Sequence, residues 1–290
     1  ITGGKKDTCT YAEGCLYREI GGLAYLPTVD KVAWNLRDWY NVAAHDQNSL
    51  GWSTPAMSQA QGVWHIGPRR ADHRFHNAKT SNYLFTAPAS SALSSSGEPR
   101  LLTGNHREAG TLHGSQGPTL YALAPWDDGD PPAPEQELAA EALLYYPEVN
   151  GCLDDPAQCT FPNYRAKDNW GGGVWVQTEE RAGVLIVGRK GLGDSCYGTP
   201  EACGGDLCDI YKGYHAYPYE PQILFYDPNA LAEVRAGTRE PWEVLPYEVH
   251  TVTEVLGGEC ALLGAATYDA ARGLIYVAER TIGASGRTAV

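Results

Sequence analysis

Residues 172–189 read GGVWVQTEERAGVLIVGR, and this stretch decides the fold class. It opens with small residues, continues as a short apolar run, passes through the polar residues TEER and returns as a second apolar run. Two apolar runs separated by a few polar residues are typical of a β-hairpin. The stretch therefore predicts two antiparallel strands joined by a polar turn.

The same pattern recurs along the chain. Residues 22–38 and 264–280 repeat it clearly, and weaker copies begin at Gly62, Gly117 and Pro221. Neighbouring starts are separated by 40 to 55 residues, which suits the four-stranded blades of a β-propeller, at about 40–50 residues each. The small residues before each first strand fit as well, because inner strands crowd together at a propeller centre. A β-sandwich is the alternative, but it does not explain the regular spacing.

We therefore expect an all-β fold, a single β-propeller of about six to seven blades with long disulfide-stapled loops, forming one domain over residues 1–290. Helical sequence is scarce. One short helix is expected after Asp227 as N-cap, with Pro228 in its first turn and Gly237 past its end. Residues 135–144, rich in Ala, Glu and Leu, are the candidate for a second helix.

The eight cysteines predict disulfides. Eight cysteines allow about a hundred connectivities, and the simplest joins near neighbours: Cys9–Cys15, Cys152–Cys159, Cys196–Cys203, and then Cys208–Cys260. Zinc binding is the alternative, but the gaps within the close pairs are longer than the spacing of about two to four residues that zinc-binding cysteines usually have. Disulfides indicate an oxidising compartment, so we expect a secreted, extracellular protein. Because the chain begins with Ile1 and has no recognisable signal peptide, we expect a mature or partial form.

Charge and hydropathy exclude two classes of partner. The chain has 22 Lys and Arg against 35 Asp and Glu, a net charge of −13, which lacks the basic surface that nucleic acids require. The longest apolar runs are about five residues, far below the roughly 18–20 that span a bilayer. We expect neither nucleic-acid binding nor a membrane span.

One basic segment stands out in this acidic chain. Residues 65–79 read HIGPRRADHRFHNAK and are followed closely by Tyr83. Such a local concentration of positive charge can hold an anionic ligand. The candidate ligand-binding residues here are His65, Arg70, Arg74, His76, Lys79 and Tyr83, and His73 is a candidate catalytic residue. Two alternatives stay open, a metal site formed by His65, His73 and His76, and a solvated loop without function.

A second candidate site precedes the apolar run that begins at Pro221. Tyr214 and His215 are candidate catalytic residues, one acting as base and the other as acid, and Tyr217 and Tyr219 are candidate sugar-stacking residues. The alternative is a rigid, packed Tyr-Pro loop. No cofactor is indicated. Calcium could find oxygen ligands at Asp127, Asp128 and Asp130, or at Asp154 and Asp155, although no EF-hand pattern is present.

Three segments resemble parts of trypsin-like serine proteases: the N-terminal Ile1-Thr-Gly-Gly, the stretch that ends at His45, and Gly193-Asp194-Ser195. The resemblance would imply a Ser–His–Asp mechanism. However, Ser195 is followed by Cys196-Tyr197 instead of glycines, and the acidic member of the triad has no good match. A serine protease is therefore a remote alternative.

Segments between residues 170 and 279, including GRKGLGDSCYG and GYHAYPYEPQILFYDP, resemble a group of secreted bacterial β-propeller proteins. That resemblance implies fold and secretion, not an activity. Some polysaccharide lyases also use propellers with His, Tyr and Arg at the active centre, an analogy at the level of fold. We therefore expect a protein that binds an anionic polysaccharide. In the catalytic version of this expectation the protein is a lyase that cleaves the bound polymer. In that version Arg70 and Arg74 neutralise a uronate. The competing expectation is a non-catalytic adhesion or assembly protein.

Overall fold

The structure is a computed structural model. It describes the strands at residues 22–26, 31–35, 41–42, 65–66, 78–79 and 137–138, and residues 83–94, 97, 99–104, 115–123, 140–146, 149 and 151–280. The described part is mostly β, with two four-stranded antiparallel sheets and several two-stranded ones.

The two larger sheets have the same simple topology, in which the strands lie side by side in chain order. The first sheet contains β6 (Tyr83–Ala87), β7 (Arg100–Gly104), β8 (Leu120–Leu123) and β10 (Ala140–Leu144). The second contains β11 (Asn169–Gln177), β12 (Ala182–Gly191), β15 (Tyr219–Tyr226) and β16 (Glu248–Thr251). Both are therefore antiparallel meanders.

The smaller sheets are pairs of strands. Four are antiparallel: β1 (Gly22–Leu26) with β2 (Lys31–Asn35), β4 (His65–Ile66) with β5 (Ala78–Lys79), β13 (Cys196–Gly198) with β14 (Gly213–His215), and β17 (Leu262–Asp269) with β18 (Leu274–Arg280). β3 (Asn41–Val42) and β9 (Glu137–Leu138) pair in parallel. One α-helix, α2 (Pro228–Arg235), and four short 3-10 helices, η3 (Pro156–Gln158), η4 (Glu201–Cys203), η5 (Pro241–Glu243) and η6 (Gly258–Cys260), complete the described elements.

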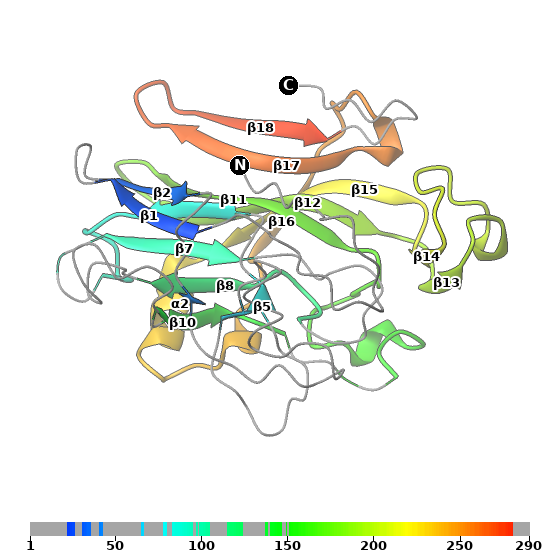
Figure 1. The fold of residues 1–290 in the computed structure, drawn as a ribbon, viewed down its shortest axis with the longest axis horizontal. Coiled ribbons are helices and arrows are strands. Elements are labelled where there is room, and N and C mark those ends of the chain that lie inside the picture. The colour runs from blue at the N-terminus through cyan, green and yellow to red at the C-terminus, as the bar shows by residue number, and fades with distance from the viewer. Residues whose placement is uncertain are drawn as a thin grey trace.

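The sheets are stacked in layers. Figure 1 shows β17 and β18 above the β11–β16 sheet, which in turn lies above β7, β8 and β10. The main core fills the space between the two four-stranded sheets, where Leu102 and Leu120 meet Trp170, Ile186 and other buried residues. The apolar face of α2 closes the same core through Leu231 and Val234.

Glycines allow the first strands of the three stacked sheets to approach one another. A Cβ atom added at Gly172 of β11 would lie 1.8 Å from the carbonyl oxygen of Gly264 in β17. One added at Gly173 would lie 2.6 Å from the ring of Phe85 in β6. Such distances are far inside van der Waals contact, so only glycine fits. The small residues expected at crowded first strands are confirmed at this position.

The three strongest hairpin predictions are confirmed, at residues 22–38, 172–189 and 264–280. Of the three weaker starts, Gly62 lies outside the described residues, and the other two need correction. Gly117 and Pro221 lead into β8 and β15, which are third strands of four-stranded sheets rather than first strands. The true first strands begin at residues 83, 169 and 262, so the sheets recur at about twice the predicted spacing. The described residues form no closed propeller ring.

The helix predictions have opposite outcomes. α2 is confirmed: the side chain of Asp227 accepts a hydrogen bond from the amide of Asn229, Pro228 occupies the first turn, and Gly237 follows with φ of 71°. The helix expected at residues 135–144 is wrong, because this stretch forms β9 and β10. Leu143 and Leu144 are fully buried in the core, and pairing with β8 outweighs the helical propensity of the stretch.

Three of the four predicted disulfides are present, Cys152–Cys159, Cys196–Cys203 and Cys208–Cys260. Cys9 and Cys15 lie outside the described residues. In the described part of the chain, no helix is long and apolar enough to cross a membrane.

Candidate functional site

Buried charges gather at one end of the second sheet. Across the described part of the chain, the buried Asp, Lys, Arg and His side chains are Asp168, Arg189, Lys190, Asp206 and His215. All five belong to the end of that sheet where β11 begins, β12 ends and β15 begins. Burying a charge is costly unless it is paired, so such a concentration marks a candidate functional site.

Asp168 and Lys190 form a buried ion pair at the edge of this cluster. Oδ2 of Asp168 accepts hydrogen bonds from Lys190 Nζ at 2.5 Å and from the amide of Arg165 at 3.1 Å, and Oδ1 accepts one from the amide of Gly191 at 2.9 Å. Burial raises the pKa of Asp168, an effect that the contact with Lys190 partly offsets. Burial likewise lowers the pKa of Lys190. The pair therefore joins the start of β11 to the end of β12.

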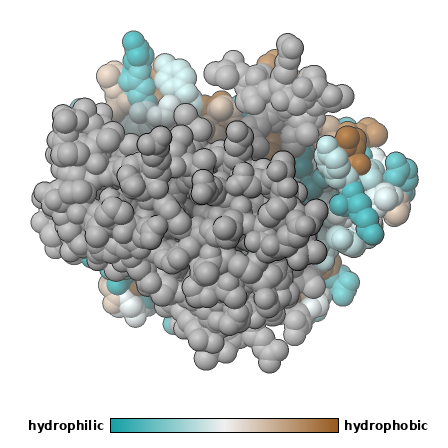
Figure 2. Space-filling model, viewed as in Figure 1, coloured by the Kyte–Doolittle hydropathy of each residue, from teal (hydrophilic) through white to brown (hydrophobic). Residues whose placement is uncertain are grey.

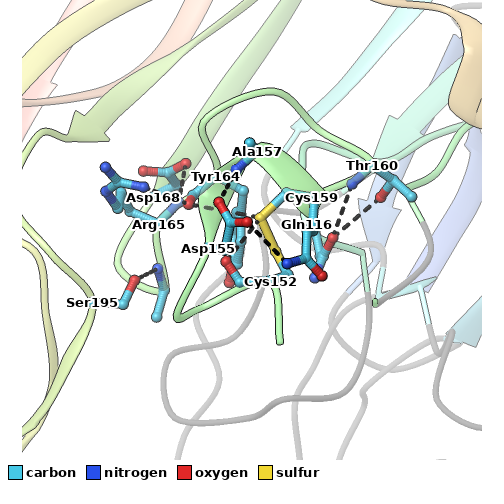
Figure 3. Close-up of a disulfide and its surroundings, with 12 residues drawn as sticks. Gln116, Cys152, Asp155, Ala157, Cys159, Thr160, Tyr164, Arg165, Asp168 and Ser195 are labelled. Carbon is cyan, nitrogen blue, oxygen red and sulfur yellow. Dashed lines mark hydrogen bonds between the residues drawn. A yellow bond between two sulfur atoms is a disulfide. The ribbon is translucent and has the colours of Figure 1, made fainter. Parts of the chain in front are cut away.

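A stapled loop holds Asp168 in place. Figure 3 shows the Cys152–Cys159 disulfide beside Asp155, whose side chain caps η3 by accepting the amide of Ala157. Farther along the loop, Thr160 donates to the side-chain oxygen of Gln116. These contacts anchor the segment that leads into β11 to the first sheet.

An insertion, here named the arm, occupies residues 192–218 between β12 and β15. It contains β13, η4 and β14, and in Figure 1 it projects beyond the end of the sheet. The amide of Leu192 donates to the carbonyl oxygens of Ala216 and Pro218, which closes the neck of the arm. The Cys196–Cys203 disulfide fastens the arm internally, and Cys208–Cys260 fastens it to η6.

The root of the arm is a buried hydrogen-bond network centred on Asp206. One carboxylate oxygen accepts the amides of Cys208 and Asp209, and the other accepts the Tyr219 hydroxyl at 2.5 Å and contacts His215 Nδ1 at 2.8 Å. The second ring nitrogen of His215, Nε2, lies 3.2 Å from the carbonyl oxygen of Gly198. Both ring nitrogens therefore lie within hydrogen-bond distance of oxygen atoms of the arm.

This network shifts two pKa values in opposite directions. Burial alone would raise the pKa of Asp206, but the hydrogen bonds from Tyr219 and His215 outweigh burial and hold it below its usual value. Burial and the bond to Asp206 raise the pKa of Tyr219. The Tyr219 phenol is thus kept protonated, which suits a hydrogen-bond donor and not a base.

Arg189 lies beside this network on β12. Its guanidinium carbon is 4.1 Å from the centre of the Tyr219 ring, a cation–π contact. The side chain is only 1% exposed, yet none of the described residues accepts a hydrogen bond from Nε or Nη1. The buried Oδ1 of Asn169, directly across the strand pair from Arg189, also has no partner among the described residues.

The outer surface of the arm is rich in tyrosine. Tyr197 and Tyr211 are 60% and 73% exposed, and Tyr197 packs edge-on against Tyr214 with ring centres 5.1 Å apart. Lys212 Nζ lies over the Tyr197 ring. Hydrophobic and hydrophilic surface alternate on the side where Figure 1 places β13 and β14 (Figure 2). Exposed tyrosines on a disulfide-fastened arm form a rigid surface suited to stacking.

The structure brings together four of the predicted site residues. Tyr214, His215 and Tyr217 lie on the arm and Tyr219 follows directly on β15, but His215 and Tyr219 are buried and belong to its root. Tyr217 donates a hydrogen bond to Glu259.

The other predicted site residues do not join them. Tyr83 is buried in the main core, where its hydroxyl donates to the carbonyl of Thr119. The backbones of His65 and Lys79 pair across β4 and β5. Arg70, His73, Arg74 and His76 lie outside the described residues.

Sequence reasoning missed Asp168, Arg189, Lys190 and Asp206. A signal existed for two of them, because Arg189 and Lys190 interrupt the apolar run of β12. Consecutive charges in a strand with buried residues before and after them must themselves be buried, and buried charges need partners.

The remaining predictions can be placed only in part. The hydroxyl of Ser195 accepts a hydrogen bond from the amide of Ala166 at 2.9 Å (Figure 3), and His45 lies outside the described residues. Asp155 caps η3, and Asp127, Asp128 and Asp130 lie outside the described residues. Within the described ranges, no three His, Cys, Asp or Glu side chains group as metal ligands.

The chain was also compared with known families, curated proteins and solved structures. None of them matches it. The likeness to secreted bacterial propellers is therefore an expectation from the quoted sequence segments, and a function has to be argued from the arm and its root.

Proposed function

We propose that this is a secreted protein of propeller architecture that binds an anionic polysaccharide. Support for the architecture comes from two successive four-stranded meanders, whose first strands β6 and β11 lie next to each other, and from β17, the first strand of the β17–β18 pair, which lies next to β11. In a propeller the first strands of successive blades lie next to one another in the same way, because the blades surround a common axis. An experimental structure in which the sheets do not surround a common axis would overturn the architecture.

The observation that carries the binding proposal is the tyrosine surface of the arm. Tyr197, Tyr211 and Tyr214 present aromatic rings on a segment that two disulfides fasten. Aromatic rings bury large areas against sugar faces at little cost in side-chain entropy when the segment is already rigid. Disulfides also agree with a protein that works outside the cell.

The charge for an anionic polymer has to come from elsewhere, because the arm itself is acidic: it contains Asp194, Glu201, Asp206 and Asp209 against Lys212. We assign that role to the basic segment at residues 65–79. The arm thus provides stacking, and the basic segment provides electrostatic attraction.

The test is affinity electrophoresis through gels that contain uronate polymers or neutral polymers. We expect the wild-type protein to be retarded by a uronate polymer, and Tyr211→Ala and Tyr197→Ala each to weaken binding about tenfold, equivalent to about 1.4 kcal/mol. Tyr247→Ala removes an equally exposed tyrosine from outside the arm and serves as the matched control. No retardation by any polymer would overturn the proposal.

Cleavage is the catalytic version of the same proposal, with Tyr214 or His215 as base or acid and His73 as a further catalytic residue. It receives less support, because His215 is fully buried and both its ring nitrogens are engaged. Ultraviolet absorbance of unsaturated products from uronate polymers tests it directly. Binding without such products would retire catalysis and leave the binding function.

One observation favours the second candidate function, assembly. Leu274, Ile275 and Tyr276 on β18 are each at least 39% exposed, and β18 pairs only with β17 among the described strands. An open strand edge with apolar side chains can pair with another chain. Concentration-dependent association in sedimentation, abolished by Ile275→Lys, would favour assembly over ligand binding.

A further inference from the structure

Arg189 is the one basic member of the buried cluster that contacts no carboxylate among the described residues. Lys190 contacts Asp168, and His215 contacts Asp206. The carboxylates of Asp206, Asp209 and Asp168 are near enough to favour the charged form of Arg189, but none of them contacts it. In the described part of the chain, Arg189 has neither a salt bridge nor a hydrogen-bond acceptor at Nε or Nη1. Its guanidinium is held instead against the ring of Tyr219 at 4.1 Å.

Such an arrangement is unfavourable for folding alone. A buried guanidinium loses its hydration, and an unmade hydrogen bond to a charged group is more costly than one to a neutral group. A cation–π contact offsets only part of that loss. A site that binds an anion requires a positively charged group that is already held in place before the anion binds. The guanidinium of Arg189 is held against Tyr219, and its Nε and Nη1 have no acceptor among the described residues.

We propose that Arg189 binds the carboxylate of a uronate residue and that Oδ1 of Asn169 accepts a hydrogen bond from a neighbouring hydroxyl group of the same sugar. The inference rests on the proposed polysaccharide-binding function. The guanidinium edge offers parallel N–H donors that match a carboxylate in two-point geometry. Asn169 lies opposite Arg189 across β11 and β12, and its free Oδ1 is an acceptor. A uronate carries both groups that such a site would bind, a carboxylate for Arg189 and neighbouring hydroxyl groups for Asn169.

Entry to this site requires the arm to move at its neck as a rigid unit. Arg189 is 1% exposed, and it lies three residues before Leu192, whose amide closes the neck by bonding to Ala216 and Pro218. The arm is fastened to η6 by Cys208–Cys260 and to the sheet by the Asp206 network. We therefore expect uronate binding to change amide hydrogen exchange within residues 192–218 more than elsewhere.

The test uses the full chain, with oligogalacturonate and the same oligomer methyl-esterified as probes. Wild-type protein is expected to bind the acid at least about tenfold more tightly than the ester, the usual effect of a hydrogen bond to a charged group. Arg189→Met is expected to weaken binding of the acid and to leave binding of the ester unchanged, so that the preference becomes smaller; the basic segment at residues 65–79 accounts for what remains. The melting temperature of this variant should stay close to that of the wild-type protein, because the substitution breaks neither an ion pair nor a hydrogen bond from Nε or Nη1 in the described part of the chain. Arg239→Met, which removes a partly exposed arginine paired with Glu233, is the matched control and should keep the preference.

The outcomes separate this inference from the proposed function. An acid preference as large in Arg189→Met as in the wild-type protein, or a large fall in the melting temperature of this variant, overturns the assignment of Arg189. Equal binding of acid and ester that still depends on Tyr211 overturns the carboxylate site but leaves polysaccharide binding in place. No binding of either oligomer, nor of neutral polymers, overturns the proposed function and this site with it.

Discussion

His215 Nδ1 lies 2.8 Å from Oδ2 of Asp206, and both side chains are completely enclosed. Asp206 belongs to the turn after η4 and His215 to the end of β14, so the contact closes the arm on itself. The same carboxylate receives the Tyr219 hydroxyl from β15. One aspartate therefore joins both halves of the arm to the sheet.

Replacing Asp206 by Ala should be severely destabilising. It leaves a buried His215, a buried phenol and two backbone amides without their acceptor, and each buried group left unsatisfied costs about 1–3 kcal/mol. Urea unfolding measures the loss. Asp194→Ala, on the exposed part of the same arm, should stay within about 0.5 kcal/mol of wild type. Equal stability of the two variants would contradict the central role of Asp206.

Low pH should remove the stability that the Asp206 network gives to the arm. Because the folded-state pKa of Asp206 is held below its ordinary value of 3.8, its contribution is complete above that pH and is lost as the pH falls through the folded-state pKa. Unfolding free energy measured against pH should fall in this range. Asp206→Asn should flatten that part of the profile; an unchanged slope would show that other carboxyls cause it.

Alkali should destabilise the core through its tyrosines. Burial raises the pKa of Tyr146 above its usual 10.0, and its hydroxyl donates to the carbonyl of Val244 at 2.6 Å. The stabilising contribution is complete below pH 10 and is lost as the pH rises toward the folded-state pKa. The share of the phenolate absorbance that comes from the buried tyrosines should therefore appear only together with unfolding. Ionisation of every tyrosine in a still-folded protein would contradict the burial of these rings.

Gly172→Ala should disturb the contact between sheets. Its Cβ would meet the backbone of Gly264 at 1.8 Å, and backbone cannot rotate away as a side chain can. We expect a loss of about 1–3 kcal/mol or more in thermal unfolding. Gly213→Ala on β14, with no atom within 4 Å of the added Cβ, is the control. A tolerated Gly172→Ala would mean that β11 and β17 do not pack this closely.

The long-range disulfide should matter more than the short one. Cys208–Cys260 spans 52 residues and Cys196–Cys203 spans 7, and loop-closure entropy favours the longer bridge. Converting the Cys208–Cys260 pair to alanine should cost about 2–4 kcal/mol, and converting the other pair less. Equal losses in denaturant unfolding would argue against an entropic origin.

Local sequence patterns predicted local structure well. The hairpin at residues 172–189 and the capped helix after Asp227 follow from periodicity and from side chains that act on their own neighbours. The three described disulfides match the simplest pairing, two of them between cysteines close in sequence.

What failed depended on distant partners. Nothing near Pro221 reveals that β15 is the third strand of a sheet, because the arm separates it from β12. Residues 135–144 have helical composition, yet pairing with β8 makes them strands. The same holds for the candidate site: His215 was recognised as notable, but its partner Asp206 and the unpaired Arg189 emerge only from the fold.

The position of the arm has an evolutionary consequence. β12 and β15 are adjacent antiparallel strands, and Gly191 is paired directly with Tyr219, so the whole arm leaves and re-enters the sheet at one point. A two-residue turn could bridge that point without altering strand register. The outer part of the arm, beyond the Asp206 network, can therefore be lengthened, shortened or exchanged by insertion and deletion while the sheet stays the same, so the surface that the arm presents can diverge faster than the scaffold.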